Sequence, residues 1–190
     1  MSELNHLLHA AYELVQSLDK MTDDSLPQEI ADVVKLHAKL AVGSAWVPVP
    51  GADVAAGAVN IWTMYLRING KIGMKLGESI LKTIASAVAT NLAGYAAVLA
   101  VGGALKFIPG IGSIGGAVVM SGALYAVTLA SGYVYLKALT ALIKKGGTID
   151  GIKLKDAVDN FMQNNRKEIK DFINAAKKNF KDEKCDMSQM

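Results

Sequence analysis

Charged and aromatic residues are scarce in this chain. Charged side chains make up 19% of its 190 residues and aromatic ones 6%, whereas hydrophobic residues make up 52%. A soluble domain usually carries about a quarter charged residues. The apolar content is mostly aliphatic, and 18 glycines accompany it. We therefore predict a single helical domain, residues 1–190, that is unusually apolar for its size.

The chain has one cysteine, Cys185, and no readable export signal. A single thiol excludes an intramolecular disulfide and fits a reducing compartment. The first lysine or arginine is Lys20, whereas a secretory signal peptide begins with a basic region. We expect no signal peptide, and a protein in the cytoplasm with conditional membrane association or on the cytoplasmic face of a membrane.

Groups able to carry catalysis or to bind a metal are also sparse. Glu78 is the only acid in residues 54–143. His6, His9 and His37 are too few and too dispersed for a zinc site, which needs three or four converging ligands. The GxGxxG match at residues 110–115 lacks the strand before it and the acid after it that a dinucleotide site requires. We predict a non-enzymatic protein with no cofactor and no metal.

Charge is spread unevenly along the chain. Residues 1–53 carry a net charge of −5, residues 54–143 of +5 and residues 144–190 of +3. Such an asymmetry steers a protein toward an anionic surface. The excess of +3 over the whole chain is too mild to indicate nucleic-acid binding.

Amphipathic helices are predicted at both ends of the chain. Residues 1–46 contain two of them, and the second carries an apolar stripe at helical spacing: Ile30, Val33, Val34, His37 and Ala41. Residues 152–181 show another such stripe, which includes Ile152, with charged residues on the opposite face. Residues 182–190 are expected to form a polar tail.

A third helix is predicted to begin after the proline-containing stretch of residues 46–53. Asp53 is a natural N-cap for it, and we expect the helix to continue to about Leu76. Arg67, Lys71 and Lys75 follow one another at intervals of four residues, so they would share one face. They are candidate contacts for anionic lipid headgroups, although a basic stripe is equally typical of a solvated helix face.

Two long uncharged intervals dominate the middle of the sequence. No charged residue lies among the 23 positions between Lys82 and Lys106, or among the 30 between Lys106 and Lys137. Each interval is long enough to cross a hydrocarbon core, which takes about 20 residues. Residues 83–143 are therefore predicted to form a Gly/Ala-rich antiparallel helical hairpin.

The turn of this hairpin is expected at residues 108–116. Pro109, Gly110 and Gly112 are its turn residues. Lys106 lies close to the turn, where it can extend to a membrane interface or cap a helix end. The expected architecture is thus all-α, with about six helices and a central apolar hairpin wrapped by amphipathic helices.

Several short motifs in this region match a known family. They are the Pro-Gly-Ala-Asp segment at 50–53 followed by Trp62 and Met64, the segment at 105–112, and Thr128 with Gly132. Over residues 45–143 the chain resembles the helical domain of unknown function that follows the G domain in some bacterial Era-like and dynamin-like GTPases. That domain also occurs in bacterial inner-membrane proteins and is related to the helical domain of immunity-related GTPases. The core matching this family would span residues 53–145.

The resemblance implies membrane association and a partner role, and it brings no catalytic residues. The GxxxxGK[ST] motif of a nucleotide-binding loop is absent from the chain. Any GTPase that works with this chain would therefore be a separately encoded protein.

Three functions are compatible with these patterns. The first is a membrane-associating helical protein, whether an anchor, a remodelling accessory or a membrane-inserting effector, that acts through the hairpin and binds lipid. The second is a soluble interaction module whose apolar surface is covered by a partner or by a second copy. The third is a carrier of a lipid or another apolar ligand. Ala/Gly-rich spans insert only marginally into membranes, so the hairpin is compatible with either a buried or an inserted state.

Overall fold

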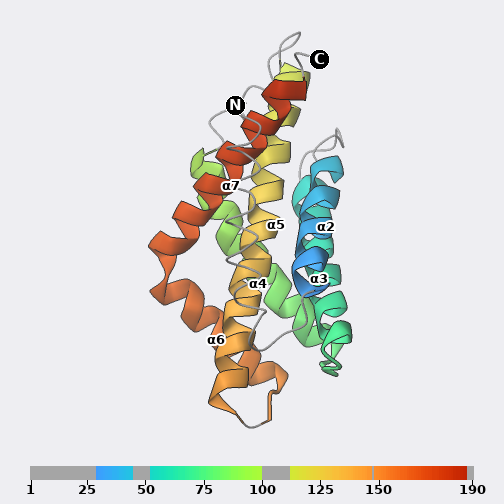
Figure 1. Cartoon of the computed structure of the whole chain (residues 1–190), viewed down its shortest axis with the longest axis vertical. Coiled ribbons are helices and arrows are strands. Elements are labelled where there is room, and N and C mark those ends of the chain that lie inside the picture. Colours follow the sequence, from blue (N-terminus) through green and yellow to red (C-terminus); the bar gives the residue numbers. More distant parts are fainter. Residues whose placement is uncertain (1–28, 45–51, 100–111, 147, 188–190) are drawn as a thin grey trace.

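The computed structural model of the protein describes residues 29–44, 52–99, 112–146 and 148–187 (Figure 1). All regular elements within these ranges are α-helices: α2 (Glu29–Ser44), α3 (Ala52–Lys71), α4 (Glu78–Leu99), α5 (Gly112–Lys145), α6 (Gly151–Asn164) and α7 (Arg166–Met187). The all-α prediction is confirmed. The amphipathic helix expected before residue 20 lies outside the described residues.

Helix α5 lies at the centre of the molecule. In Figure 1 it runs along the long axis, with α2 and α3 on one side and α7 on the other. It contacts each of the other five described helices, and its most extensive contacts are with α2 and α7. The longest and most apolar helix is thus the one that the others enclose.

The amphipathic pattern of α2 is present in the structure. Ile30, Val34, His37 and Ala41 are buried, and Val33 is buried at the edge of the same stripe. This stripe faces α3 and α5, the two helices that α2 contacts. The predicted second amphipathic helix is confirmed.

The two apolar helices of the expected hairpin are packed differently. Helix α4 buries one face and exposes a polar one, formed by Lys82, Thr83, Ser86, Thr90 and Asn91. Helix α5 has no exposed side chain between Ser121 and Thr140. Helix α4 is therefore a surface helix of the bundle, whereas α5 is its core.

The hairpin itself is only partly described. Helices α4 and α5 contact each other and run in opposite directions along the molecule (Figure 1), but the segment that connects them, residues 100–111, lies outside the described residues. The turn was expected to extend to residue 116, and this is wrong, because α5 already begins at Gly112. Glycine lowers helix propensity without preventing a helix that tertiary contacts support.

The third helix ends earlier than expected. Helix α3 stops at Lys71, and Gly73 has a φ of 69°. The amide of Met74 donates to the carbonyl oxygen of Asn69 at 2.9 Å, and that of Gly73 to Gly70 at 3.3 Å. These two bonds form a Schellman motif, which favours glycine at the left-handed position. The prediction that the helix continues to Leu76 is wrong.

The C-terminal amphipathic helix is interrupted. Helix α6 ends at Asn164 and α7 begins at Arg166; Asn165 between them donates its amide to the carbonyl oxygen of Phe161 at 3.0 Å. The single helix expected over 152–181 is therefore two helices. Ile152 was expected in the buried stripe, but it is 71% exposed, because the stripe that α6 buries consists of Leu154, Val158 and Met162.

Candidate functional site

The basic stripe predicted on the third helix is divided in the structure. Arg67 and Lys71 are exposed on α3, but Lys71 forms an ion pair with Glu29 of α2. Lys75 is exposed in the connection that follows the Schellman motif. The prediction that the three residues share one helix face is wrong, because the left-handed turn at Gly73 takes Lys75 off the helix.

The remaining predicted site residues lie in or beside undescribed segments. Lys106, Pro109 and Gly110 are outside the described residues. Gly112 is the first residue of α5. Asp53 is the second residue of α3, which begins at Ala52, so the helix starts one residue earlier than its expected N-cap; only the backbone is described there. The roles of Lys106, Pro109 and Gly110 stay predictions, whereas Asp53 and Gly112 lie inside helices and do not hold the cap and turn positions expected for them.

Within the described residues, α5 is the one helix long and apolar enough to cross a membrane. The qualifying stretch is Ser121–Lys145, 25 residues long, and its most apolar 18-residue window has a mean hydropathy of 1.5. In this structure 78% of its apolar window is buried. That burial is also typical of the core helix of a soluble protein, so length and composition alone do not decide between the two environments.

Two tyrosine hydroxyls form hydrogen bonds between α3 and α5 inside the bundle. The Tyr65 hydroxyl of α3 donates to the carbonyl oxygen of Ser131 at 3.1 Å, and the Tyr135 hydroxyl of α5 donates to Oδ1 of Asn69 at 2.8 Å. The two tyrosine rings are stacked, with centroids 4.0 Å apart. Since a buried polar group without a partner is costly, these reciprocal bonds favour one arrangement of α3 against α5.

Helix α7 covers another side of α5 through Tyr133. The Tyr133 hydroxyl donates to the carboxylate of Glu168, and its ring stacks on Phe172 with centroids 4.7 Å apart. Phe161 of α6 meets the same ring edge-on at 6.1 Å. The ammonium of Lys137 lies 5.3 Å from the ring centroid, so the only charged side chain in this part of α5 is placed at an aromatic face.

Helix α2 covers α5 at very close range. A Cβ on Gly132 would lie 2.5 Å from Cγ1 of Val34, so only glycine fits there. The Nδ1 of His37 lies 2.8 Å from Oδ1 of Asn60, and Asn60 donates to the carbonyl oxygen of His37. Because Oδ1 only accepts, Nδ1 of His37 carries the proton.

His37 is therefore a buried neutral histidine between α2 and α3. Its Nε2 is buried with no hydrogen-bond partner among the described residues. Burial lowers the pKa of His37 below its usual value; the hydrogen bond that His37 donates to Asn60 opposes this shift, and nearby Arg67 adds to it. The predicted place of His37 in the apolar stripe of the second helix is confirmed.

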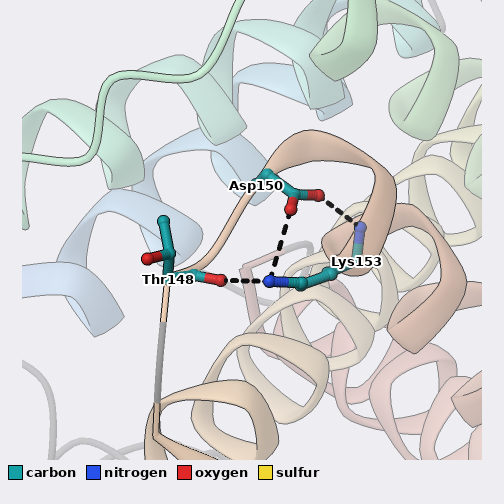
Figure 2. A network of polar contacts seen from close by, with 3 residues as sticks. All are labelled: Thr148, Asp150 and Lys153. Carbon is teal, nitrogen blue, oxygen red and sulfur yellow. Dashed lines mark hydrogen bonds and ion pairs between the residues drawn. The ribbon is translucent and has the colours of Figure 1, made fainter.

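One end of the molecule combines positive charge with exposed apolar side chains, which sequence reasoning missed. Figure 2 shows its polar framework, in which Nζ of Lys153 donates to the carbonyl oxygen of Thr148 at 2.8 Å and lies 3.4 Å from Oδ2 of Asp150. Asp150 caps α6 by accepting from the amide of Lys153 at 2.9 Å. That hydrogen bond lowers the pKa of the Asp150 carboxyl.

A cleft lies beside this framework, between the end of α5 and the start of α6. Its volume is about 470 Å³, within the range of pockets that hold small ligands. Leu142, Ile149 and Ala157 form its apolar part, and Lys145, Thr148, Lys153, Asp156 and Asn160 contribute polar groups. Two lysines and one carboxylate thus line the cleft, and Lys153 is already paired with Asp150.

The fold and the site define an all-helical protein built around one helix of membrane-spanning length. Its sequence is 31% identical over 119 residues to magnetosome membrane protein 22 of Magnetospirillum gryphiswaldense, and the aligned region covers 61% of this chain and 61% of that protein. The match thus spans less than two thirds of the relative's length. No protein-family model and no solved structure matches the chain. The resemblance to the GTPase-associated helical domain stays a prediction.

Proposed function

We propose that this chain is a non-enzymatic, membrane-associating helical protein whose apolar helices α4 and α5 form the membrane element. The observation that carries the proposal is α5, a helix of spanning length and apolarity enclosed by the other helices. Its similarity over 119 residues to a protein named as a membrane protein supports the same function.

The balance of insertion energies favours a conditional over a spontaneous span. Ser121–Lys145 contains five Leu, two Val and one Ile, and each contributes about 0.3–0.6 kcal/mol on insertion, or about 2–5 kcal/mol together. Lys137 lies about one turn from the centre of this stretch and costs about 2.5–3.5 kcal/mol there. The two contributions nearly cancel, so α5 needs either a covering protein surface or an additional attraction to lipid.

Insertion of α5 requires its covering helices to separate from it. The contacts to break include the tyrosine hydrogen bonds between α3 and α5, the close approach of α2 to Gly132, and the contacts of α7 with Tyr133. Helix α7 is strongly charged on its outer face, where Arg166, Lys167 and Asp171 are exposed. Such a helix remains in water when α5 enters lipid.

The role at the membrane is that of an anchor, a remodelling accessory or an inserting effector. A separately encoded GTPase is the partner that the sequence resemblance implies, and a second copy of the chain is another candidate partner. The cytoplasmic side of the membrane is the compartment in which we place the protein, because its one cysteine fits a reducing environment.

Flotation of the purified full-length chain with liposomes tests the proposal. Vesicles of phosphatidylcholine, with and without phosphatidylglycerol, are washed at high salt after binding. We expect flotation that resists the wash, because a hydrophobic insertion is not screened by salt. Release of a trapped dye then distinguishes an inserting effector from an anchor. Protein that stays unbound with both vesicle types would rule out direct membrane association.

A soluble interaction module is the second candidate. The burial of 78% of the apolar window of α5 favours this candidate, because apolar side chains that other helices already bury gain little free energy by entering lipid. This candidate predicts a protein that ignores both vesicle types and forms a defined complex by size-exclusion chromatography with light scattering.

A further inference from the structure

The end of the molecule where α5 meets α6 exposes one large apolar side chain and leaves several others only partly covered. Ile152 is 71% exposed, the most of any large hydrophobic residue described. Around this end, apolar side chains are only partly buried at the edge of the core: Ile72, Met74, Leu76, Ile80, Leu142, Ile143 and Ile149. They come from the α3–α4 connection, the start of α4, the end of α5 and the segment before α6.

Close packing joins these segments into one surface. Helices α4 and α6 are in contact, and a Cβ on Gly151 would lie 2.8 Å from Cγ1 of Ile80. In Figure 1 the α3–α4 and α5–α6 connections lie at the same lower end of the molecule. We call this surface, residues 72–80 together with 142–153, the α5–α6 tip.

Positive charge accompanies the apolar groups at the tip. Lys75, Lys144 and Lys145 are exposed, and no ion pair is found for them among the described residues. Two of the acids nearby are already engaged: Asp150 with Lys153, and Asp159 with Lys155 at 2.6 Å. Glu78 and Asp156 are the other exposed acids at this end, so the exposed lysines give the tip an excess of cations.

We propose that the α5–α6 tip is the surface that docks on an anionic lipid bilayer: Ile152 enters the interfacial region, and Lys144 and Lys145 contact headgroup phosphates. The combination of a protruding aliphatic side chain with flanking lysines matches the chemistry of an anionic phospholipid surface, which is apolar below a layer of phosphates. The hydrogen bonds that Lys153 makes with Thr148 and Asp150 hold the start of α6 (Figure 2), and Ile152 is the second residue of that helix.

This inference rests on the proposed membrane association and adds the side by which the protein approaches lipid. Docking at the tip does not require α5 to leave its covering helices, because every side chain involved is already at the surface. Docking at the tip is therefore a reversible first step whose affinity falls with added salt, and it precedes the salt-resistant insertion of α5.

Vesicle binding by the full-length chain at low salt tests the tip. Two variants remove its groups, Lys144→Gln/Lys145→Gln and Ile152→Ser. Two matched variants make the same chemical changes elsewhere: Lys39→Gln/Lys167→Gln, with both lysines exposed, and Val59→Ser, with a valine that is 56% exposed on α3. Thermal unfolding by circular dichroism checks that all four variants fold.

We expect the double lysine variant at the tip to bind phosphatidylglycerol vesicles about tenfold more weakly than the wild type, and Ile152→Ser about fivefold more weakly. The matched variants should stay within twofold of the wild type. If the wild type binds and the tip variants bind as well as the matched variants, docking through the α5–α6 tip is wrong, whereas the proposed membrane association still stands. A wild type that binds neither vesicle type would overturn both.

A fluorescence measurement gives a second, independent test. In a Cys185→Ser background, an environment-sensitive dye is attached at Ile152→Cys or, as the matched position, at Val59→Cys. We expect a blue shift on phosphatidylglycerol vesicles at position 152 and none at position 59. A shift of equal size at both positions would mean that the protein does not approach lipid by the tip.

Discussion

Helices α4 and α5 differ in their surroundings although both come from uncharged stretches of the sequence. Helix α4 shows a polar face of small side chains to solvent, including Thr83, Ser86 and Thr90. Helix α5 has no exposed side chain from Ser121 to Thr140, and most side chains in this range are buried. The absence of charge therefore does not define a buried or membrane-spanning helix, because hydroxyl and amide side chains spaced three or four residues apart are enough to form a solvated face.

Substitution of one serine by lysine in each helix should give the largest difference in unfolding free energy between α4 and α5. Ser131→Lys puts a charge where the side chain is fully buried, and we expect it to lower the free energy of unfolding by about 3–5 kcal/mol. Ser86→Lys on the exposed face of α4 should change it by less than about 0.5 kcal/mol. Urea denaturation followed by circular dichroism measures both. Similar losses in the two variants would mean that α4 is also a core helix.

Removal of buried volume should give the next largest difference. Leu136 of α5 is 0% exposed, and Leu136→Ala should lower the free energy of unfolding by about 3 kcal/mol through lost burial and the cavity left behind. Thr90→Ala on α4 is the matched change at an exposed position and should stay within about 0.5 kcal/mol. A small loss for Leu136→Ala would contradict the central position of α5.

The close approach of α2 to α5 predicts a smaller effect. Gly132→Ala brings a methyl group against Val34 and should cost about 1–3 kcal/mol of unfolding free energy. Gly70→Ala near the end of α3 meets nothing within 4 Å, and it should be neutral or stabilising by up to about 1 kcal/mol. Equal effects of the two substitutions would show that α2 does not pack against Gly132 in solution.

Acidification should lower the free energy of unfolding through His37, which lies between α2 and α3. This is the smallest of the expected effects. Burial lowers the pKa of His37 in the folded protein, so the unfolded chain binds the proton more readily, with a pKa near 6.5. The contribution of neutral His37 to the free energy of unfolding is fully present above about pH 6.5. It is lost as the pH falls toward the pKa of His37 in the folded protein. Denaturation of wild type and His37→Gln at pH 7.5 and 5.5, in parallel, measures the contribution. A pH dependence that survives in His37→Gln would assign it to other groups.

Much of the fold could be predicted from the periodicity of apolar residues. The stripe of α2 was predicted because Ile30, Val34 and His37 recur at helical spacing, and all are buried. The ends of helices were predicted less well. Neither the left-handed turn at Gly73 nor the break at Asn165 has a distinctive local signal, because an isolated glycine or asparagine is also tolerated inside a helix.

The candidate site could be predicted only in part. A helix of membrane-spanning length was visible from the uncharged interval that precedes Lys137. The tip was not, because it joins residues near 75, 145 and 152 through tertiary contacts such as that of Gly151 with Ile80. Ile152 was misplaced for a related reason. The helical stripe that begins there in the sequence starts only at Leu154 in the structure.

The order of the helices along the chain determines when each side of α5 can be covered during synthesis. The helices that α5 packs against most extensively, α2 and α7, stand before and after it in the sequence. Between Lys145 and Met187 lie 42 residues of translation, which at about 5–20 residues per second take roughly 2–8 s. During that interval the side of α5 that carries Tyr133 has been made and α7 has not. The free energy of inserting α5 into lipid is close to zero. Whether α5 first contacts a bilayer or α7 therefore depends on how close the ribosome is to a membrane, as well as on the affinity of α5 for each.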